Sequence, residues 1–512
     1  MIQRILLVDI EYDRQMAGQI TEYEAAGNTH HPLGLMYLAA MVRKQFPDVQ
    51  VRILHTATCQ NAEESLKTAL KEFSPQLVGL RALSLFQKPF KHLAQVVRET
   101  RPEAFLIGGG PYPSGSYREI VDNVVDLVVR GEGEMTFVEL IEWLNRHGTY
   151  PDHLDGTVVK VNGELIINPA RGEIENIDVL PKPAYNLIQL SDYKGIYNLA
   201  NQSTATCVFI ESSRGCTYKC YYCHAALSKT VRRRSPELVL DELQDHYNRG
   251  VRDFVFVDDI FNVPKKIAKE ILRGIIQRLP GVSLNFSNGL RADRLDDEIL
   301  DLFEEAGTVQ MSLAVETATP RLQKLIVKYL DIPKAAEMIH KASQRFIVRT
   351  LFMVGFPTES LEEAWSTVNM AKEFSYVAEP AMSIVRVYPG TPLFDALNPT
   401  PVEARKIEDQ TADSLLTRLM DSPSFYGDFF PREKVPLTGK NIQEIRWEWM
   451  RNIYHNRERI RNSHGVLERH LNHEQILTFY RNLYQKPDFD DKTLERFLGY
   501  ARTESSAAET PA

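Results

Sequence analysis

Residues 211–227 read ESSRGCTYKCYYCHAAL and gather three of the five cysteines of the chain into one short stretch. Cys216, Cys220 and Cys223 follow a CxxxCxxC spacing. Three thiolates on one loop can hold three irons of a [4Fe–4S] cluster, and because no fourth ligand is supplied, one iron stays open to a substrate or cosubstrate. The spacing therefore favours an iron–sulfur cluster with an open iron.

Zinc and unliganded thiols are the alternatives for this loop. Cys207 or His224 could complete a zinc knuckle, but such knuckles usually combine two CxxC pairs, and the sequence has no second pair. Cys59 lies far from the loop in sequence and is predicted to be a plain thiol, buried or partly buried. Cysteines bunched in this way do not form a disulfide framework, and a reducing compartment suits an iron–sulfur cluster.

The cysteine loop resembles that of the radical S-adenosylmethionine (SAM) superfamily, in which an aromatic residue, here Tyr222, precedes the last cysteine. The resemblance implies that Cys216, Cys220 and Cys223 ligate the cluster, and that SAM binds the open iron through its amine and carboxylate. In that family the reduced cluster converts SAM to methionine and a 5′-deoxyadenosyl radical, which takes hydrogen from an unactivated carbon. An external electron donor of the flavodoxin or ferredoxin type is then an expected partner.

Length and composition limit the other classes of protein. The 512 residues can form about two to four domains, and 43% hydrophobic with 25% charged residues is typical of a globular protein. A net charge of −8 argues against nucleic acid as a partner, since phosphate-binding faces are usually basic. No apolar run approaches the roughly 20 residues of a transmembrane helix, so no transmembrane segment and a cytoplasmic location are expected.

Residues 1–150 alternate short β-branched runs with helical periodicity, which is typical of βαβ units and a parallel sheet. Strands are predicted at 4–9, 49–54, 77–83, 104–107 and 125–129. Helices are predicted at 34–45, 62–73, 88–100 and 133–147. Five strands with intervening helices fit a flavodoxin-like doubly wound domain, whose ligand would lie beyond the carboxyl ends of the strands.

Three loops at these strand ends are distinctive: HHPLGLMYLAA (30–40), IGGGPYPS (107–114) and VVRGEGEMTF (128–137). Glycine after a strand lets the backbone approach a bulky ligand, and the amides of the next helix point the same way. A nucleotide is the alternative ligand, but GGGPYPS lacks the lysine of a phosphate loop. In this order ahead of CxxxCxxC, the loops resemble the cobalamin-binding domain of radical SAM proteins such as the class B methyltransferases. The resemblance implies cobalamin contacts from Leu33, Gly34, Arg81, Ala82, Ser84, Gly109, Gly110, Pro111, Gly131, Glu132 and Gly133.

The lower face of cobalamin is expected to lack a protein histidine. Cobalamin mutases and methionine synthase carry DxHxxG after the first strand, whereas Asp9 is followed here by IEYD, and His30 and His31 lie too far along the chain. Arg81 stands where related domains generally have a small residue such as serine. Two interpretations are open for Arg81: an ion pair with a nearby carboxylate, or a guanidinium that shields the lower cobalt face without coordinating it.

Residues 151–200 are predicted to form a hairpin that turns at Asn162 and Gly163, followed by a connector stiffened by two prolines. Residues 201–400 return to alternation, with strands predicted at 205–211, 253–257, 283–287, 310–315, 348–354 and 382–387. The helices between them are predicted at 265–278, 296–305, 321–328, 333–344 and 361–374. Six parallel strands make a partial (β/α)6 TIM-type barrel, whose chemistry is expected at the carboxyl-terminal rim.

Polar residues end successive strands of that barrel. The resemblance places Asp258 and Asp259 near the SAM amine, likens Glu316 to the family's GxES segment, and likens the turn that begins at Gly355 to a GxPxE segment beside the adenine. A lone carboxylate is more often a helix cap or an ion-pair partner, but their shared position favours function. The expected SAM contacts are Tyr222, Asp258, Asp259, Ser287, Arg291, Glu316, Gly355, Phe356 and Pro357, with Asn288 beside them.

Residues 401–503 are predicted to be a helical C-terminal region and residues 504–512 a disordered tail. Residues 441–462 carry an apolar stripe at helical spacing with arginines opposite, which predicts a helix packed on the barrel with a solvated basic face. A helix that lies on a membrane surface is the alternative. The resemblance implies a C-methyltransferase acting on a small molecule, natural-product-like or lipid-like, with a [4Fe–4S] cluster, SAM and cobalamin. Two alternatives are a radical SAM cyclase or rearrangement enzyme without methyl transfer, and a non-enzymatic module that senses cobalamin or a metal.

Overall fold

The structure is a computed structural model that describes residues 1–13, 30–193, 206–223, 230–388, 391–404, 406–407, 425–484, 488–496 and 498. The chain divides into two compact units. Unit 1 comprises Met1–Tyr193, Ala225–Ser228 and Ala404–Asp421, and unit 2 comprises Lys194–His224, Lys229–Glu403 and Ser422–Ala512.

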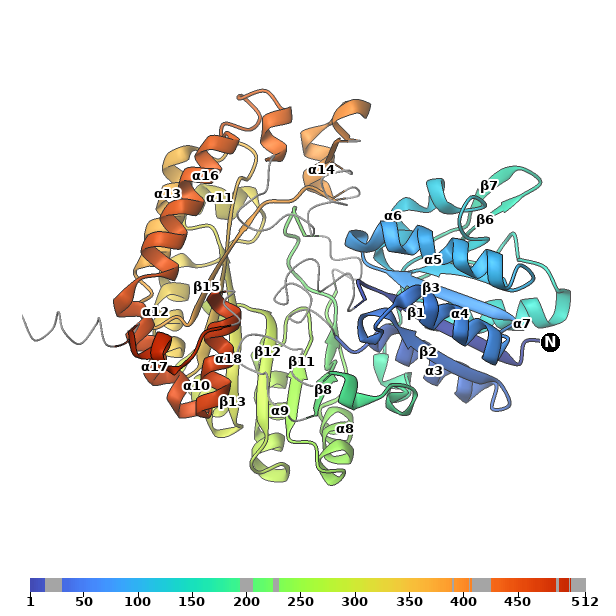
Figure 1. Ribbon diagram of the computed structural model, residues 1–512, viewed down its shortest axis with the longest axis horizontal. Coiled ribbons are helices and arrows are strands. Elements are labelled where there is room, and N and C mark those ends of the chain that lie inside the picture. The colour runs from blue at the N-terminus through green and yellow to red at the C-terminus, as the bar shows by residue number, and fades with distance from the viewer. Residues whose placement is uncertain are drawn as a thin grey trace, which may run out of the picture. The chain divides into compact units, whose positions relative to one another are not determined.

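In its described residues, unit 1 forms a seven-stranded sheet in the order β2-β1-β3-β4-β5-β6-β7 (Figure 1). Its parallel strands are β1 (Arg4–Ile10), β2 (Gln50–His55), β3 (Leu77–Ala82), β4 (Phe105–Gly109) and β5 (Leu127–Val129). The order 2-1-3-4-5 is that of flavodoxin-like domains, so the predicted doubly wound fold is confirmed. Helices cover both faces, so residues 5–8 of β1 are all apolar and show no polar alternation.

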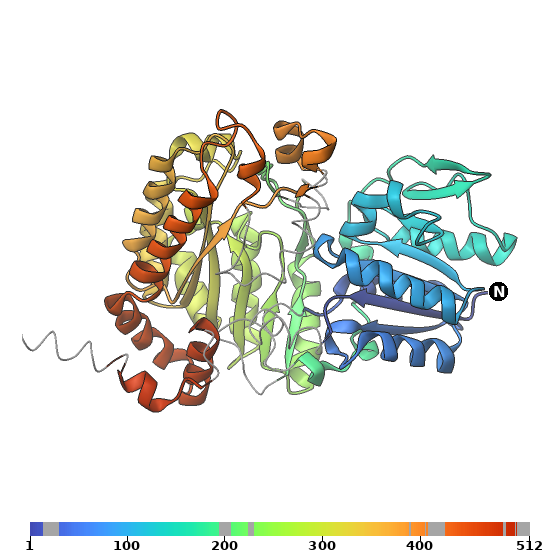
Figure 2. The same ribbon diagram turned by 45° about the horizontal axis from the view of Figure 1, so that its top comes forward.

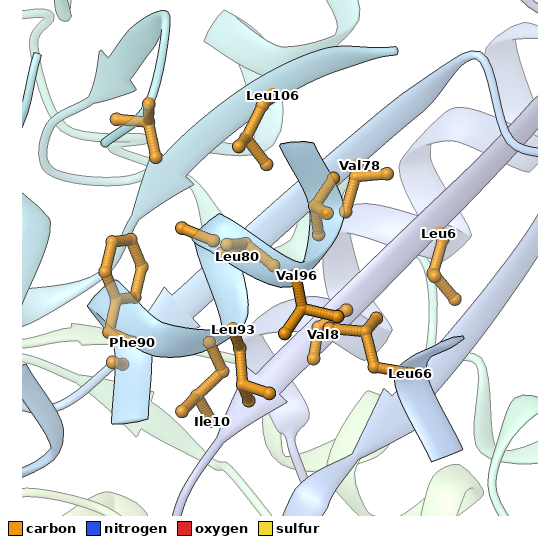
Figure 3. Close-up of a cluster of buried hydrophobic side chains, with 14 of the residues drawn as sticks. Leu6, Val8, Ile10, Leu66, Val78, Leu80, Phe90, Leu93, Val96 and Leu106 are labelled. Atoms are coloured by element: carbon orange, nitrogen blue, oxygen red, sulfur yellow. The ribbon is translucent and has the colours of Figure 1, made fainter. Parts of the chain in front are cut away.

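Two hydrophobic cores lie on the two faces of this sheet. One core joins the strands to α4 (Ala62–Phe73), α5 (Gln87–Thr100) and α6 (Pro111–Ile120). Figure 3 shows Leu6 and Val8 of β1 in this core, with Leu66 of α4 and Val96 of α5. The other core joins the strands to α3 (Leu33–Gln45) and α7 (Glu134–His147).

Helix α6 is an element that the sequence interpretation missed, because PYPS was taken as part of a glycine-rich loop. Pro111 occupies the first helical position, where its missing N–H removes no hydrogen bond of the helix. Gly110 precedes it with a φ of 85°, a conformation that glycine adopts without strain. The chain therefore leaves β4 and enters a helix directly.

The predicted hairpin is present as β6 (Thr157–Val161) and β7 (Glu164–Ile167). Asn162 and Gly163 both have positive φ, at 50° and 88°, which suits a two-residue hairpin turn. β6 pairs antiparallel with β5, so the hairpin extends the sheet of unit 1.

Unit 2 contains, among its described residues, a six-stranded parallel sheet in the order β15-β14-β13-β12-β11-β8. Its strands are β8 (Cys207–Ile210), β11 (Asp253–Phe256), β12 (Ser283–Leu290), β13 (Thr308–Glu316), β14 (Ile347–Val354) and β15 (Glu379–Ile384). The connecting helices are α8 (Pro236–Asn248), α9 (Lys265–Arg278), α10 (Asp297–Glu305), α11 (Pro320–Leu325), α12 (Ile332–Ser343) and α13 (Leu361–Lys372). Strands follow one another in chain order with helices outside (Figures 1 and 2), which confirms the partial TIM-type barrel.

The C-terminal part of unit 2 is helical, as predicted, but residues 441–462 do not form one helix. The chain forms α14 (Pro392–Leu397), α16 (Gly439–Trp449), the π-helical turn η8 (Met450–Tyr454), α17 (Arg457–His470) and α18 (His473–Tyr484). The Asn456 side chain caps α17 by accepting from the Arg459 N–H at 2.9 Å, and this starts a new helix. The predicted stripe is confirmed, since all its members are buried: Ile442, Ile445, Trp449, Ile453 and Ile460.

The predicted solvated basic face of this region is wrong for Arg459. Its side chain is buried and donates to the carbonyls of Val377 and Ala378, each at 2.9 Å. Arg459 therefore fastens α17 to the segment that precedes β15. Across the described residues, no helix is both long and apolar enough to span a bilayer. The predicted disordered tail, 504–512, lies outside the described residues.

Candidate functional site

The cysteine loop of unit 2 begins directly after β8 and is closed by a short ribbon. In that ribbon β9 (Ser213–Arg214) pairs antiparallel with β10 (Arg232–Arg233). Arg233 donates to the carbonyls of Ile260 and Phe261, at 2.9 and 3.1 Å. The ribbon is thereby bonded to the loop after β11, which fixes both ends of the cysteine loop at the carboxyl ends of the strands.

Asp258 and Asp259, predicted SAM contacts, also hold the start of this loop. The Asp258 carboxylate is buried and accepts from the hydroxyls of Ser212, at 2.7 Å, and of Ser213. Burial raises the pKa of Asp258, although these hydroxyls oppose the shift. Asp259 is exposed and accepts from the Gly215 N–H at 3.1 Å. Asp259 is therefore the more accessible of the two carboxylates.

Tyr221 fastens the middle of the loop through its backbone. Its N–H donates to the Ile326 carbonyl at 3.2 Å, just beyond α11, and its carbonyl accepts from the Leu393 N–H at 3.0 Å, in α14. The Tyr221 ring stacks on Phe356, with centroids 6.4 Å apart. The loop is thus bonded to elements that follow β13 and β15, and stacked on the turn after β14.

Tyr222 and Glu316 are brought together as the sequence led us to expect, and a third residue joins them. The Tyr222 hydroxyl donates to the Glu316 carboxylate. Burial raises the pKa of Tyr222, and the negative charge of Glu316 raises it further. Lys328 Nζ lies 2.8 Å from Glu316 Oε1, and both side chains are buried. Lys328 was not predicted as a site residue. The predicted helix 321–328 is too long, since α11 ends at Leu325 and Lys328 lies in the irregular segment that follows it.

Arg291, also a predicted SAM contact, is occupied by protein groups. Its guanidinium makes two hydrogen bonds with Asp293, at 2.8 and 2.7 Å, and donates to the Lys328 carbonyl at 2.7 Å. The same group lies over the Tyr218 ring, 3.9 Å from the centroid. Arg291 is 3% exposed and supports the loop between Cys216 and Cys220.

The turn Gly355–Phe356 is held from three sides. Glu359 accepts from the backbone N–H groups of Gly355, at 2.5 Å, and Phe356, at 2.9 Å. Burial raises the pKa of Glu359 to about 7, although these N–H groups oppose the shift. The Tyr426 hydroxyl donates to the Gly355 carbonyl at 2.7 Å, and Phe356 also packs on Tyr222 at 5.6 Å. Glu359 is the last residue of the GxPxE-like segment GFPTE, although it was not named among the expected contacts. Tyr426 reaches this turn because the fold brings the C-terminal region to it.

The remaining predicted SAM contacts lie at the same rim without joining this cluster. Ser287 Oγ donates to the Phe256 carbonyl at 3.5 Å. The Asn288 amide donates to the carbonyls of Val257 and Asp258, at 2.8 and 3.1 Å. Pro357 is half-buried after Phe356. Ser287 and Asn288 thus tie β12 to the end of β11.

The donor chemistry of the loop suits an iron–sulfur cluster. Cys216 and Cys220 are half-buried and Cys223 is exposed. Cys216 and Cys223 both interact electrostatically with Cys220. In the ranges that the structure describes, no three His, Cys, Asp or Glu side chains are arranged so that they could hold a metal ion. The fit to an iron–sulfur cluster therefore rests on the chemistry of the three thiols and not on a preformed site. Cys207 lies in β8, and burial, then Asp253, raises the pKa of its thiol to about 12. Cys59 is half-buried, in line with the prediction of a plain thiol.

In unit 1, the residues expected to bind cobalamin lie at the carboxyl edge of the sheet. Arg81 pairs in register with Gly109, and a Cβ atom on Gly110 would lie 2.8 Å from Arg81 Cγ. Ala82 ends β3, Ser84 begins the short helix η2 (Ser84–Phe86), and Pro111 begins α6. Parallel register therefore brings the loops after β3 and β4 together, as predicted.

Where α3 and α7 begin at this edge of the sheet, two glycines have open space beside them. A Cβ atom added to Gly34 or Gly131 would meet no atom within 4 Å, and Gly131 has a φ of 74°. A Cβ atom added to Gly133 would lie 3.4 Å from Leu38 of α3, and Leu33 begins that helix. Glu132 accepts from the Ile174 N–H at 2.9 Å. Open glycines at a strand-end edge fit a bulky planar ligand such as cobalamin.

Two histidines at this edge are buried and packed on one tyrosine. His55 Nδ1 lies 2.9 Å from the Tyr193 hydroxyl, and His55 Nε2 lies 3.8 Å from Glu11. The His31 ring packs edge-on against Tyr193, with centroids 4.5 Å apart. His55 is thus engaged by Tyr193 and Glu11 within unit 1.

A flavodoxin-like unit and a six-stranded partial barrel with a three-cysteine rim loop define a class of radical SAM proteins with a second cofactor domain. The model for the radical SAM superfamily matches residues 210–371, and the model for the B12 binding domain matches residues 24–141. This chain belongs to the radical SAM superfamily, in the branch that carries a B12-binding domain. The predicted cofactors, a [4Fe–4S] cluster, SAM and cobalamin, are those of its two domains.

Similar proteins include methyltransferases and a cyclase. An uncharacterized methyltransferase of Pyrococcus horikoshii is 30% identical over 378 residues, covering 72% of this chain and 79% of the relative. The anaerobic magnesium-protoporphyrin IX monomethyl ester cyclase of Rubrivivax gelatinosus is 24% identical, covering 73% and 66%. The radical S-adenosylmethionine methyltransferase TsrM of Kitasatospora setae, solved with cobalamin and a [4Fe–4S] cluster, matches with a TM-score of 0.63 at 20% identity over 78% of each chain. The structural match shows a shared fold.

Proposed function

We propose that this radical SAM enzyme is a cobalamin-dependent C-methyltransferase that acts on an unactivated carbon of a small molecule, natural-product-like or lipid-like. The observation that supports it most is the cysteine loop, which is folded at a barrel rim between Glu316 and Phe356 in a chain that also carries a B12-binding domain. The similarity to a methyltransferase of Pyrococcus horikoshii favours methyl transfer.

In this proposal the chain's own residues bind, orient and exclude water. Cys216, Cys220 and Cys223 would ligate the cluster, and the Gly355–Phe356 turn would support the adenine of SAM. When bound, the cofactors supply a carbon-centred radical and a methyl group. The buried rings of Tyr221 and Phe356 would keep water away from the radical, and fixed groups would hold the reacting atoms at short distance. The reducing electron would come from an external donor of the flavodoxin or ferredoxin type.

Two other functions compete with this one. A cyclase or rearrangement enzyme would use the same radical without methyl transfer, and one relative is named as a cyclase. A non-enzymatic sensor of cobalamin or metal would have no use for the buried cluster of Tyr222, Glu316 and Lys328 at the rim. The polar rim therefore favours an enzyme.

Product analysis after anaerobic reconstitution separates the three functions. The full chain, loaded with iron, sulfide and cobalamin, is reduced and given SAM with small-molecule extracts. Methyl transfer yields S-adenosylhomocysteine together with 5′-deoxyadenosine, a cyclase yields only 5′-deoxyadenosine, and a sensor yields neither. The Cys220→Ala chain is the control and is expected to form no 5′-deoxyadenosine. Formation of 5′-deoxyadenosine without S-adenosylhomocysteine would overturn the methyltransferase proposal.

A further inference from the structure

Four exposed side chains of unit 2 belong to the cysteine loop or to segments bonded to it, and we call them the loop patch: Lys219, Arg294, Lys324 and Tyr329. Lys219 directly precedes Cys220 in the loop. Tyr329 is 60% exposed and the Arg294 side chain 54% exposed, and both lysines are exposed as well. The patch therefore presents three cations and one aromatic ring beside the residues expected to hold the cluster.

The segment after α11 holds Lys324 and Tyr329 next to the loop. The Tyr221 N–H donates to the Ile326 carbonyl at 3.2 Å, and Ile326 lies two residues after Lys324. The Tyr329 N–H donates to the Gln323 carbonyl at 3.2 Å, in α11. The exposed ring of Tyr329 therefore stands on a backbone that is fixed beside the loop.

Arg291 fastens the segment after β12 to another part of the loop. Its guanidinium lies over the Tyr218 ring, 3.9 Å from the centroid, and donates to the Tyr329 carbonyl at 3.1 Å. Arg294 lies three residues further on, and its nearest approach to the Asp293 carboxylate is 3.9 Å. The Asp293 side chain is 4% exposed and makes two hydrogen bonds with Arg291, so its charge is engaged within the fold while Arg294 stays exposed.

The cations of the loop patch are largely unopposed. Among the residues that the structure describes, Lys219 and Lys324 form no ion pair. Asp331, exposed two residues after Tyr329, caps α12 by accepting from the Lys334 N–H at 3.1 Å. The whole chain carries a net charge of −8, so a positive patch at this loop departs locally from the composition.

The Tyr329 ring is exposed on a strained backbone. Tyr329 and Val327 have positive φ angles of 49° and 57°, a conformation that is disfavoured for non-glycine residues and most of all for a β-branched residue such as valine. Strain of this kind persists only where the surroundings impose it, and it gathers at functional sites. Tyrosine and arginine are also enriched among the residues that carry the binding energy of protein interfaces. Tyr329 and Arg294 thus suit the centre of an interface.

We propose that the loop patch is the docking surface for an acidic flavodoxin-type protein that reduces the cluster. This inference rests on the proposed function, since it needs a cluster on the three cysteines and the external donor named there. The Tyr329 ring among cations favours a flavodoxin-type donor, in which carboxylates surround the edge of a planar flavin. A patch of this size suffices, because weak electron-transfer complexes bury less than roughly 1,200 Å².

The transfer itself moves one electron. The flavin hydroquinone anion of the donor loses the electron and becomes the neutral semiquinone, the cluster gains it, and no bond or proton is transferred. The rate of such a transfer falls steeply with distance, and Lys219 is the chain neighbour of Cys220, so a donor held on the patch lies close to the cluster ligands. Opposite charges speed the encounter, and salt screens them with a Debye length of about 10 Å at about 0.1 M.

The test is the rate at which a bacterial flavodoxin, in its hydroquinone form, reduces the cluster of the full chain, followed anaerobically by stopped-flow absorbance. Iron and sulfide are counted first in each variant. Lys219→Glu with Lys324→Glu is expected to lower the second-order rate constant about tenfold at low salt, and by less at about 0.5 M salt. Lys324→Glu alone should give a smaller loss. Its matched control is Arg249→Glu, which reverses an exposed cation before β11, at the opposite edge of the sheet, and should leave the rate unchanged.

Two further variants and a second reductant separate docking from damage to the cluster. Arg294→Glu with Lys324→Glu leaves the sequence of the cysteine loop intact, so it tests the patch if Lys219→Glu loses iron. Tyr329→Asn removes the ring with a residue that accepts the left-handed backbone, and should weaken flavodoxin binding in calorimetric titration. Photoreduced 5-deazariboflavin is small and neutral and needs no docking surface, so it should reduce every variant at one rate.

The outcomes distinguish this inference from the proposed function. A chain that binds no iron would contradict the proposed function, and salt-dependent flavodoxin binding that the charge reversals abolish would still support the patch. Equal rates with flavodoxin in Lys324→Glu, in both double variants and in Arg249→Glu, all with full iron, would overturn only the docking inference. Slower reduction by flavodoxin and deazariboflavin alike would also overturn it, since the substitutions would then act on the cluster. Reduction by a ferredoxin and not by flavodoxin would overturn the assignment of the donor.

Discussion

Arg81 donates from Nη1 to both carboxylate oxygens of Asp9, at 2.8 and 3.0 Å. Asp9 is 1% exposed, so Arg81 supplies the charge that balances a buried carboxylate. Of the two interpretations drawn from the sequence, the ion pair is present in the structure. The Arg81 side chain is still 29% exposed at the glycine-rich edge, so a second role toward cobalamin stays a prediction.

Removal of Arg81 alone is expected to destabilise the protein. Arg81→Ala leaves the Asp9 carboxylate buried and unpaired, which costs about 3 kcal/mol. The matched control replaces both partners, Arg81→Met with Asp9→Asn, and should recover most of that loss. Thermal unfolding of the full chain, followed by circular dichroism, measures the difference between the two variants. Equal melting temperatures in the single and double variants would contradict the role of the pair.

The double variant also tests the role of Arg81 toward cobalamin. Because it avoids an unpaired carboxylate, it should bind the cluster and cobalamin normally. If the guanidinium shields the lower cobalt face, this variant forms less methylated product per 5′-deoxyadenosine. An unchanged ratio, with both cofactors bound, would leave Arg81 as a structural ion pair.

The cysteine loop predicts a sharp division among the cysteines. Alanine at Cys216, Cys220 or Cys223 should remove the iron bound after anaerobic reconstitution, because each thiolate supplies one of three cluster ligands. Cys207→Ala is the matched control, since Cys207 lies buried in β8 and its thiol has a raised pKa. Iron and sulfide assays measure the result. Loss of iron in Cys207→Ala equal to that in Cys220→Ala would contradict the open iron.

The strands of both units were predictable because each is a short apolar run between helical patterns. The flavodoxin-like order of unit 1 and the chain order of unit 2 follow once the strands are parallel, since crossovers are then short and right-handed. Helix α6 was hidden by its prolines, which are usually read as loop residues, although Pro111 suits a first turn. The break at Asn456 was hidden by an apolar stripe that continues across it.

The rim residues were predictable as a group because parallel strands end at one edge. Their individual partners were not predictable, because they come from distant segments. Arg291 is engaged by Asp293 and by carbonyls of the segment after α11, and Asp258 by two serines that follow β8. Lys328 and Tyr426 reach the rim only because the fold brings their segments there. Strand-end position is visible in a sequence, whereas the pairing of side chains is not.

Gly355 is expected to tolerate no side chain. It has a φ of 96°, and a Cβ atom would lie 2.8 Å from the Phe425 ring. Gly250, with a φ of 93° and no atom within 4 Å of a Cβ, is the matched control. Gly250→Ala should lose about 1 kcal/mol through its backbone alone, and Gly355→Ala a further 1–3 kcal/mol or so through overpacking. Thermal unfolding checks the stabilities, and calorimetric titration should show weaker SAM binding only for Gly355→Ala.

We expect stability to depend on pH through Glu359 with a sign opposite to that of its neighbour Glu363. Burial raises the folded-state pKa of Glu359 from 4.5 to about 7, so the folded protein holds a proton there that the unfolded chain has released. Stability therefore falls as pH rises from about 4.5 to about 7, by about 3 kcal/mol for a shift of this size, and stays low above it. Arg321 lowers the pKa of Glu363, so the contribution of Glu363 is lost only below about pH 4.5.

Glutamine variants at these two positions separate the effects. Gln at 359 resembles the protonated acid and can still accept from the Gly355 and Phe356 N–H groups, so Glu359→Gln should match the unsubstituted chain near pH 5 and exceed its stability near pH 8. Glu363→Gln removes an ion pair that is charged at both pH values, so its loss should be equal at pH 5 and pH 8. Melting temperatures of the full chain at the two pH values measure both differences. A Glu359→Gln effect of the same size at pH 5 and pH 8 would mean that Glu359 ionises as an ordinary carboxyl, and that burial does not govern this turn.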